Sequence, residues 1–295
     1  MTLTAGTFTE AAHAKVNLGL AVLARRGDGF HELETAMARI GLADAVEVHL
    51  EESARDEVTL TVSEAPELPP CELARGADNL AHLAATRYLN ARRQAAPAAQ
   101  AVALHVALTK RIPVAAGLGG GSADAGAVLS VLARTLPAAV NIGELARGLG
   151  SDVPFMVLAA NAALAKGRGE RLAPLEVPRL DLVLVNPGFA VSAADGYASL
   201  VGFTPRLRFE RVLERLEAGE EPGWPNALQP GVLRLRPELR GVLTRLREAG
   251  LRGALMSGSG PTCFGVARDA EHAASVAEHL RAAEPAWWVR ADTTL

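Results

Sequence analysis

The alternation of apolar and polar residues along the chain predicts the first elements of its fold. Short β-branched runs at 46–50 and 58–62 alternate as strands do, and 101–108 continues the pattern. Apolar residues three and four positions apart predict a helix over 79–93 with Asn79 as its N-cap, and an alanine-rich helix from Ser122 to about Leu132. We also expect helices at 144–149, 152–158, 209–216, 237–249 and 270–283, and strands at 162–166, 180–185, 253–256, 263–266 and 287–289. This mixed order predicts an α+β fold.

Composition narrows the classes of protein that the chain can belong to. Its 295 residues are 49% hydrophobic and 21% charged, with a net charge of −3, as in an ordinary globular protein of about two domains. No basic excess indicates a nucleic-acid partner, and no apolar run is long enough to span a membrane. Cys71 and Cys263 are the only cysteines, and the N-terminus has no targeting pattern. We therefore expect a cytoplasmic protein.

A cluster of glycines provides the first indication of chemistry. Gly117, Gly119, Gly120 and Gly121 lie directly before a predicted helix that Ser122 opens. Glycine lets backbone N–H groups approach an anion closely, and a helix N-terminus adds unpaired donors and partial positive charge. The segment therefore predicts a phosphate-binding loop, in which the Ser122 hydroxyl can also reach a phosphate-bound Mg²⁺.

The spacing of these glycines excludes three familiar loops. It fits neither GxxxxGK[ST], nor the strict GxGxxG register, nor the nucleophile elbow GxSxG. A tight strand-to-helix connection without a ligand is the alternative. Four clustered glycines would, however, cost a plain turn a large amount of conformational entropy.

A lysine and an aspartate are candidates for catalysis. Lys15 is one of only three lysines beside 27 arginines, and alternation places it with Asn17 on one face of a strand. The alternative for Lys15 is the solvated face of an edge strand. Asp152 could accept a proton from a substrate hydroxyl, or could simply cap the short helix that contains Pro154. A second cluster of small residues, 257–260, is either a ligand-packing loop or a tight bend.

Three separated blocks resemble one family. AKVNLGL, the segment from Pro113 to Asp124 and MSGSGPT are similar, in order and spacing, to the three motifs of the GHMP small-molecule kinases. The blocks 28–33, 148–155, 166–170 and 186–188 resemble those members of the family that phosphorylate a cytidine-diphospho-linked sugar alcohol in the non-mevalonate isoprenoid pathway. The resemblance covers about residues 11–267.

The resemblance implies a two-lobed GHMP-kinase-like fold with the active site in the cleft between the lobes, ATP and Mg²⁺ as cofactors, and Lys15 and Asp152 as the catalytic pair. It implies substrate contacts for Asn17, for Phe30 and His31 at the cytosine, and for Tyr197 as a second stacking ring. Ser122 is a candidate Mg²⁺ ligand. The implied ATP-binding residues are Asn79, Lys110, Pro113, Val114, Ala115, Ala116, Gly117, Leu118, Gly119, Gly120, Gly121, Ser122 and Ala123.

The sequence departs from the family pattern in two places and leaves two rivals open. Phe30 stands where tyrosine is usual, and 226–228 reads Asn-Ala-Leu where Asn-Asp-Leu is more frequent. A kinase for another small alcohol, of the homoserine or mevalonate type, and a non-catalytic nucleotide-binding module are the alternatives. We expect an ATP-binding lobe at 1–158, a C-terminal lobe at 159–295, a small-molecule substrate, and a monomer or weak homodimer.

Overall fold

The computed structural model describes residues 5–69 and 71–295, and the chain forms two compact units. Among the described residues, the first unit comprises 5–14, 42–69, 71–114 and 119–159, and the second comprises 15–41, 115–118 and 160–295. Two long strands, β1 (Gly6–Arg25) and β2 (His31–Glu52), contribute residues to both units. The division into an ATP-binding lobe at 1–158 and a C-terminal lobe at 159–295 stays a prediction.

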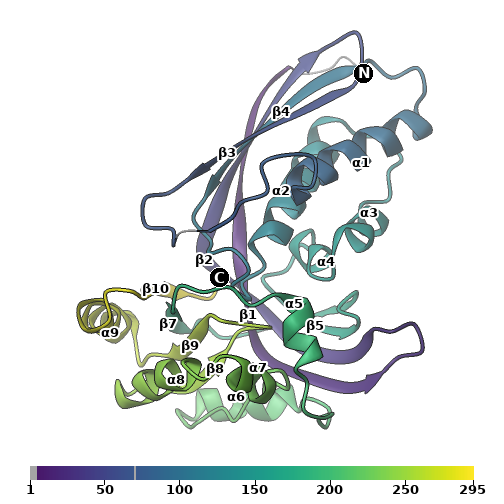
Figure 1. The fold of residues 1–295 in the computed structure, drawn as a ribbon. Helices are drawn as coiled ribbons and strands as arrows, with labels where there is room; N and C mark the ends of the chain where they lie inside the picture. Colours follow the sequence, from purple (N-terminus) through teal and green to yellow (C-terminus); the bar gives the residue numbers. More distant parts are fainter. Residues whose placement is uncertain (1–4, 70) are drawn as a thin grey trace. The chain divides into compact units, whose positions relative to one another are not determined.

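In the first unit, β4 (Val102–Lys110) is the central strand. It pairs with the end of β2 in antiparallel and with β3 (Glu57–Glu64) in parallel orientation. The side chains of β4 alternate between buried and half-buried positions, which is the pattern that predicted the strand. A parallel pair needs a crossover, and α1 (Leu80–Ala95) lies between β3 and β4 in the chain (Figure 1).

The four helices described in the first unit pack against one another beside this sheet (Figure 1). They are α1, α2 (Gly120–Thr135), α3 (Ile142–Leu149) and α4 (Val153–Met156). In α1 the buried residues recur at helical spacing, and the side chain of Asn79 accepts a hydrogen bond from the amide of Ala81, so the predicted helix and its cap are confirmed. The Tyr88 hydroxyl donates to the Leu136 carbonyl at 2.8 Å.

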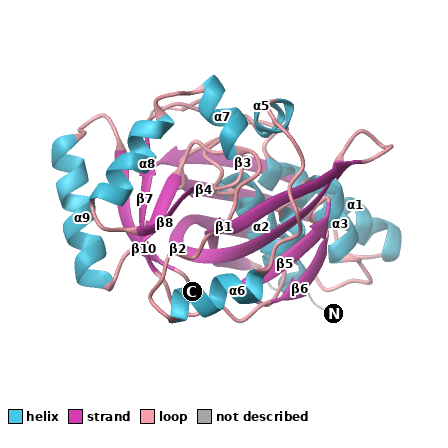
Figure 2. Ribbon diagram, turned by 90° about the horizontal axis from the view of Figure 1, so that it is seen from below, coloured by secondary structure: helices cyan, strands magenta, loops and turns pink. Residues whose placement is uncertain are grey.

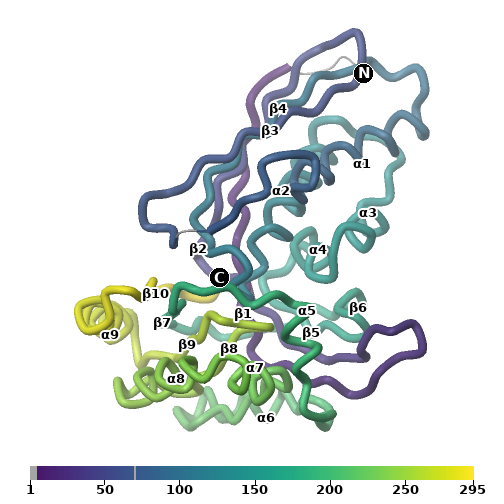
Figure 3. The backbone as a smooth tube through the Cα atoms, viewed as in Figure 1, coloured from purple at the N-terminus to yellow at the C-terminus, as the bar shows by residue number. Residues whose placement is uncertain are grey.

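In the second unit, the first part of β2 pairs with β5 (Ala162–Gly167), which pairs in turn with β6 (Arg171–Pro174). Residues 26–30, which connect β1 to β2, form the tip of the purple hairpin in Figure 3. A separate antiparallel sheet has the order β10–β7–β9–β8. Its strands are β7 (Asp181–Asn186), β8 (Arg252–Met256), β9 (Cys263–Val266) and β10 (Trp288–Thr293).

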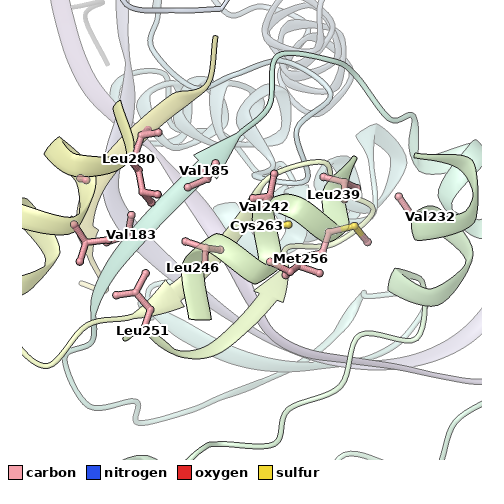
Figure 4. Close-up of a cluster of buried hydrophobic side chains, with 14 of the residues drawn as sticks. Val183, Val185, Val232, Leu239, Val242, Leu246, Leu251, Met256, Cys263 and Leu280 are labelled. Carbon is pink, nitrogen blue, oxygen red and sulfur yellow. The ribbon is translucent and has the colours of Figure 1, made fainter. Parts of the chain in front are cut away.

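Helices α8 (Leu239–Glu248) and α9 (Ala270–Ala283) pack on this antiparallel sheet (Figure 2). Their apolar faces meet β7 in a core that includes Val183, Val242, Leu246 and Leu280 (Figure 4). Cys263 belongs to the same core, where burial raises the pKa of its thiol to about 12. The remaining helices of the unit are α5 (Ala193–Ala198), α6 (Phe209–Glu217) and α7 (Gln229–Leu235).

The mixture of sheets and helices confirms the predicted α+β class. Among the helices of the described ranges, none combines the length and the apolar character that a membrane crossing would require.

Candidate active site

Lys15 lies in a stretch of β1 that is buried on both faces, from residue 14 to residue 22. Only 3% of Lys15 is exposed. Its amine donates to the side-chain oxygen of Asn17 at 2.7 Å and to the carbonyl oxygen of Gly117 at 2.9 Å. A buried ammonium needs such acceptors, because burial removes its hydration. The solvated edge-strand interpretation is therefore wrong, and Lys15 is an immobilised cation.

Asn17 is the centre of the hydrogen bonds around Lys15. Its side-chain oxygen accepts from Lys15, so its amide nitrogen must be the donor to Thr35 Oγ1, at 2.8 Å. The Thr35 hydroxyl donates to the Gly19 carbonyl at 2.7 Å. The backbone amide of Asn17 donates to Ser257 Oγ, which itself donates to the Gly117 carbonyl at 2.9 Å. Asn17 thus orients Lys15, and its predicted contact with substrate stays a prediction.

The glycine loop adopts backbone conformations that ordinary residues avoid. Ala115, Gly117 and Gly119 have φ values of 49°, 75° and 72°. A Cβ on Gly117 would lie 2.1 Å from the carbonyl oxygen of Ser257, so no side chain fits there. Residues 115–118 belong to the second unit, where the Ala116 carbonyl accepts from the Thr262 amide at 3.2 Å. The second cluster of small residues therefore packs directly on residues 115–118 of the glycine loop.

The start of α2 differs from the prediction. The helix begins at Gly120 rather than at Ser122, and Gly119 is its N-cap in the left-handed conformation. No side chain caps the helix, so Ser122 has no capping role and lies half-buried in the first turn. The first amides of a helix have no intrahelical acceptor, which leaves this terminus with the donors and partial charge that bind anions.

A buried ionic cluster lies below this helix start in the first unit. Lys110 donates to a carboxylate oxygen of Asp44 and, at 2.6 Å, to one of Asp124. The other oxygen of Asp44 accepts from the amides of Arg111 and Ile112, whereas Asp124 Oδ1 has no hydrogen-bond partner among the described residues. Burial, together with the charge of Asp44, raises the pKa of Asp124 to about 7, although Lys110 opposes the shift.

The amine of Lys110 is therefore held between two buried carboxylates. Burial lowers its pKa, but the two carboxylates outweigh burial and hold that pKa above its usual value. The amine lies 3.5 Å from the place that a Cβ on Gly120 would occupy. Asp44 and Asp124 thus hold Lys110 at the end of β4, just before the glycine loop in the chain. A direct contact between Lys110 and ATP stays a prediction.

Asp152 immediately precedes α4 and is half-buried. Its side chain makes no capping hydrogen bond with that helix, although Pro154 stands in the first turn. Asp152 is thus the N-cap residue of α4 by position, but its side chain does not make the capping hydrogen bond that this alternative expected. Asp152 belongs to the first unit and Lys15 to the second, and their pairing stays a prediction.

The residues expected to recognise cytosine are arranged in two ring contacts within the second unit. His31 stacks on Tyr197 with ring centroids 5.3 Å apart and an angle of 16° between the planes. Phe30 is 50% exposed, and the guanidinium of Arg168 lies 4.1 Å from its ring centroid. A cation on one ring face leaves the rest of an exposed ring available for stacking. The structure thus brings His31 and Tyr197 together.

Four polar residues of these networks were not assigned a role from the sequence. Ser257 and Asp124 lie in segments that the two glycine clusters indicated, whereas Thr35 and Asp44 lie in no motif of the sequence. Their partners are 14 to 240 positions away, which no local pattern can show. Asn79, in contrast, has hydrogen-bond partners that are near in sequence, because its side-chain amide also donates to the Ala74 carbonyl at 2.8 Å.

The second unit also contains a hollow of about 750 Å³ beside α6. Arg206, Arg208, Arg211 and Arg215 are among its lining residues. None of the residues assigned to nucleotide, substrate or catalysis lines it, so this hollow is not the predicted site.

Comparison with known proteins defines the class. Residues 79–160 match the family model described as "GHMP kinases N terminal domain", and residues 191–286 match "GHMP kinases C terminal". A mevalonate kinase of L. major, crystallised with R-mevalonate, shares the fold with a TM-score of 0.70 over 99% of this chain and 97% of its own, at 15% identity. The class is therefore that of the GHMP kinases.

Closer relatives specify the branch. A 4-diphosphocytidyl-2-C-methyl-D-erythritol kinase of Thermus thermophilus is 44% identical over 94% of this chain and 94% of its own length. A crystal structure of 4-(cytidine 5'-diphospho)-2C-methyl-D-erythritol kinase matches with a TM-score of 0.82 and 41% identity over 98% of this chain and all of that one. The chain belongs to the 4-diphosphocytidyl-2-C-methyl-D-erythritol kinase family.

Proposed function

We propose that the chain transfers the γ-phosphoryl group of ATP to a hydroxyl of 4-diphosphocytidyl-2-C-methyl-D-erythritol. The observation that carries the proposal is the buried ammonium of Lys15, held on the carbonyl of Gly117 inside the phosphate-loop segment. A kinase needs a fixed positive charge where negative charge develops on the attacking and transferred oxygens. The membership of the chain in a kinase family supports this assignment.

ATP phosphates are assigned to the glycine loop and the start of α2. The positive φ values of Gly117 and Gly119 support a concave row of amides, and α2 begins without a side-chain cap. The aligned peptide dipoles of a 16-residue helix add favourable potential at that end. Lys110 is assigned a supporting role, in which it neutralises Asp44 and Asp124 behind the loop.

The donor chemistry at α2 fits a Mg²⁺ ion that arrives with ATP. Ser122 offers a half-buried hydroxyl in the first turn, and hydroxyl oxygens suit a hard cation. Across residues 5–69 and 71–295, no group of three His, Cys, Asp or Glu side chains could hold a metal by itself. Ser122 would therefore contribute one ligand beside the phosphates, and the ion would neutralise phosphate charge.

The chemical step needs one proton transfer and one phosphoryl transfer. Asp152 accepts the proton of the substrate hydroxyl as the oxygen attacks the γ-phosphorus, and ADP leaves with the electrons of the broken P–O bond. Lys15 stabilises the negative charge on the attacking oxygen. The half-buried position of Asp152 at the start of α4 and the membership of the chain in a kinase family support its assignment as the base.

Recognition of the cytidine moiety is assigned to Phe30, His31 and Tyr197. An exposed aromatic ring can stack on a base, and an imidazole can hydrogen-bond the base edge. The 50% exposure of Phe30 and the contact of His31 with Tyr197 support this grouping.

A coupled assay of ADP release tests the proposal. Purified protein, ATP and Mg²⁺ are offered the cytidine-linked alcohol, homoserine and mevalonate in parallel. We expect turnover with the cytidine-linked substrate alone. Preferential turnover of homoserine or mevalonate would establish the rival kinase, and nucleotide binding without turnover of any alcohol would establish the non-catalytic module.

A further inference from the structure

Asn226 is a buried side chain to which neither the sequence pattern nor the proposed chemistry assigns a role. It is 6% exposed and follows the loop at 219–225. Its amide nitrogen donates to two carbonyl oxygens, those of Met256 at 2.7 Å and of Gly258 at 2.8 Å. Its side-chain oxygen accepts from the Leu228 amide at 2.9 Å. The amide group of Asn226 thus has partners for both of its N–H donors.

The backbone that Asn226 holds lies against Lys15. A Cβ on Gly258 would lie 3.3 Å from the Lys15 amine and 3.1 Å from the side-chain oxygen of Asn17. Gly258 has a φ of 55°, and the preceding residue, Ser257, donates its hydroxyl to the Gly117 carbonyl. The peptide groups at 256–258 therefore form one wall around the ammonium and its acceptors.

The main chain next to Asn226 is attached to the strand that carries Lys15. The Leu20 amide donates to the Pro225 carbonyl at 2.8 Å, and the Ala227 amide donates to the Leu20 carbonyl at 2.9 Å. Leu20 is five residues from Lys15 in β1. Asn226 therefore joins β1, through its main chain, to the 256–258 segment, through its side chain.

We propose that Asn226 is a positioning residue for phosphoryl transfer, which fixes the 256–258 backbone against β1 so that the Lys15 ammonium keeps its place on Gly117. The inference rests on the proposed role of Lys15. Two carbonyl oxygens converge on one nitrogen, so the position needs a neutral group with two donors. A serine hydroxyl offers only one donor, and a carboxylate offers none. Asparagine is the short side chain that meets this requirement.

Asn226→Asp provides the decisive measurement. The ionised carboxylate would place a third oxygen against the carbonyls of Met256 and Gly258, whereas the protonated acid donates to one of them. The ratio of the kcat of the variant to that of the unchanged protein, taken at each pH, should therefore rise as the pH is lowered. A role in folding alone would lower the melting temperature and leave this kcat ratio independent of pH.

Asn226→Ala measures how strongly kcat depends on the Asn226 side chain, and Gln229→Ala is its matched control. Gln229 also holds the 256–258 segment, but through one hydrogen bond from the Met256 amide at 2.9 Å rather than through a bond to Gly258. For Asn226→Ala we expect kcat to fall by about 10- to 100-fold with little change in either KM, because a small displacement of a charge-stabilising group affects the transition state most. Gln229→Ala should retain kcat within about twofold, since the Gly258 contact remains.

The outcomes separate this inference from the proposed function. An unchanged protein that binds ATP but does not phosphorylate the cytidine-linked alcohol would remove the proposed function itself. An active unchanged protein, with Asn226→Ala and Gln229→Ala equal in kcat, would overturn the positioning role. If Asn226→Ala does not fold, the pH dependence of Asn226→Asp decides alone, and a flat ratio overturns the inference.

Discussion

The amine of Lys15 donates a hydrogen bond to the carbonyl oxygen of Gly117, 2.9 Å away, across a sequence separation of 102 residues. The bond joins a strand that is buried on both faces to the loop assigned to the ATP phosphates. A second donor, the hydroxyl of Ser257, reaches the same carbonyl. The carbonyl of Gly117 therefore holds the Lys15 ammonium directly. The position of that carbonyl depends in turn on the positive φ of Gly117, where no side chain fits.

Lys15→Met should remove the charge and keep most of the side-chain volume. We expect kcat to fall by about 10²- to 10³-fold, the usual effect of losing one charge-stabilising donor. The KM for ATP should change little, because the glycine loop keeps its backbone. Steady-state kinetics with the cytidine-linked alcohol measure both quantities, and a kcat within a few-fold of the unchanged protein would contradict the role of Lys15.

Asp152→Asn should lower kcat by about 10²- to 10⁴-fold, because an amide cannot accept the hydroxyl proton. Affinity for ATP should be preserved, and calorimetric titration checks this. The double variant with Lys15→Met should be little worse than the poorer single variant, since residues that act as a unit are not additive. Full additivity would show that the two residues act independently.

Gly117→Ala and Gly121→Ala form a matched pair in the glycine loop. A Cβ at 117 would lie 2.1 Å from the Ser257 carbonyl oxygen at a φ of 75°, whereas a Cβ at 121 would meet only Leu80, at 3.5 Å. The left-handed conformation alone costs alanine about 1–2 kcal/mol, and the contact with Ser257 adds to it. Urea unfolding should show a large loss of stability for Gly117→Ala and a small change for Gly121→Ala. Equal losses would contradict the close approach of the two loops.

Asp124→Asn should change how stability depends on pH in the nucleotide-free protein. The pKa of Asp124 is about 7 in the fold and 3.8 when unperturbed, so the folded chain binds more protons than the unfolded chain between these values. The contribution of Asp124 to the free energy of unfolding therefore falls as the pH rises through this window. Asparagine removes the titration, so stability relative to the unchanged protein should rise with pH.

Urea unfolding of both proteins from about pH 5 to about pH 8 measures this difference. Asparagine keeps a side-chain oxygen that can accept from Lys110, so the amine retains an acceptor at residue 124 beside the one on Asp44. Parallel stability curves over the whole range would show that Asp124 does not titrate there.

Cytidine diphosphate should protect the protein thermally even when ADP saturates the glycine loop. At 100 times its dissociation constant, a ligand that binds only the folded protein adds about 2.7 kcal/mol to stability. His31→Ala should lose most of the protection, and Phe30→Tyr should keep it, because tyrosine retains the stacking face. Equal protection of the unchanged protein and His31→Ala would remove the cytosine assignment and favour a kinase of another alcohol.

Much of the second-unit fold was predictable because its signals are local. The helix at 270–283 was predicted with the bounds that α9 has, and the strands at 263–266 and 180–185 were predicted to within one residue. Alternation indicated a strand around Lys15 and Asn17, but the full length of β1 was not predicted, because residues 14–22 are buried on both faces and mark no strand ends. The short elements β6, α5 and α7 were also missed, since four to seven residues carry little periodicity.

The amino-acid sequence by itself determined the α+β class, the glycine loop before α2 and the blocks that identify the kinase family. These features depend on near neighbours in the chain, through periodicity, glycine conformation and helix-start geometry. Only the tertiary structure decided that Lys15 is buried on Gly117, that Lys110 is held by Asp44 and Asp124, and that Asn226 holds Gly258. Burial and hydrogen-bond partners come from residues that are distant in sequence, and only the folded chain brings them together.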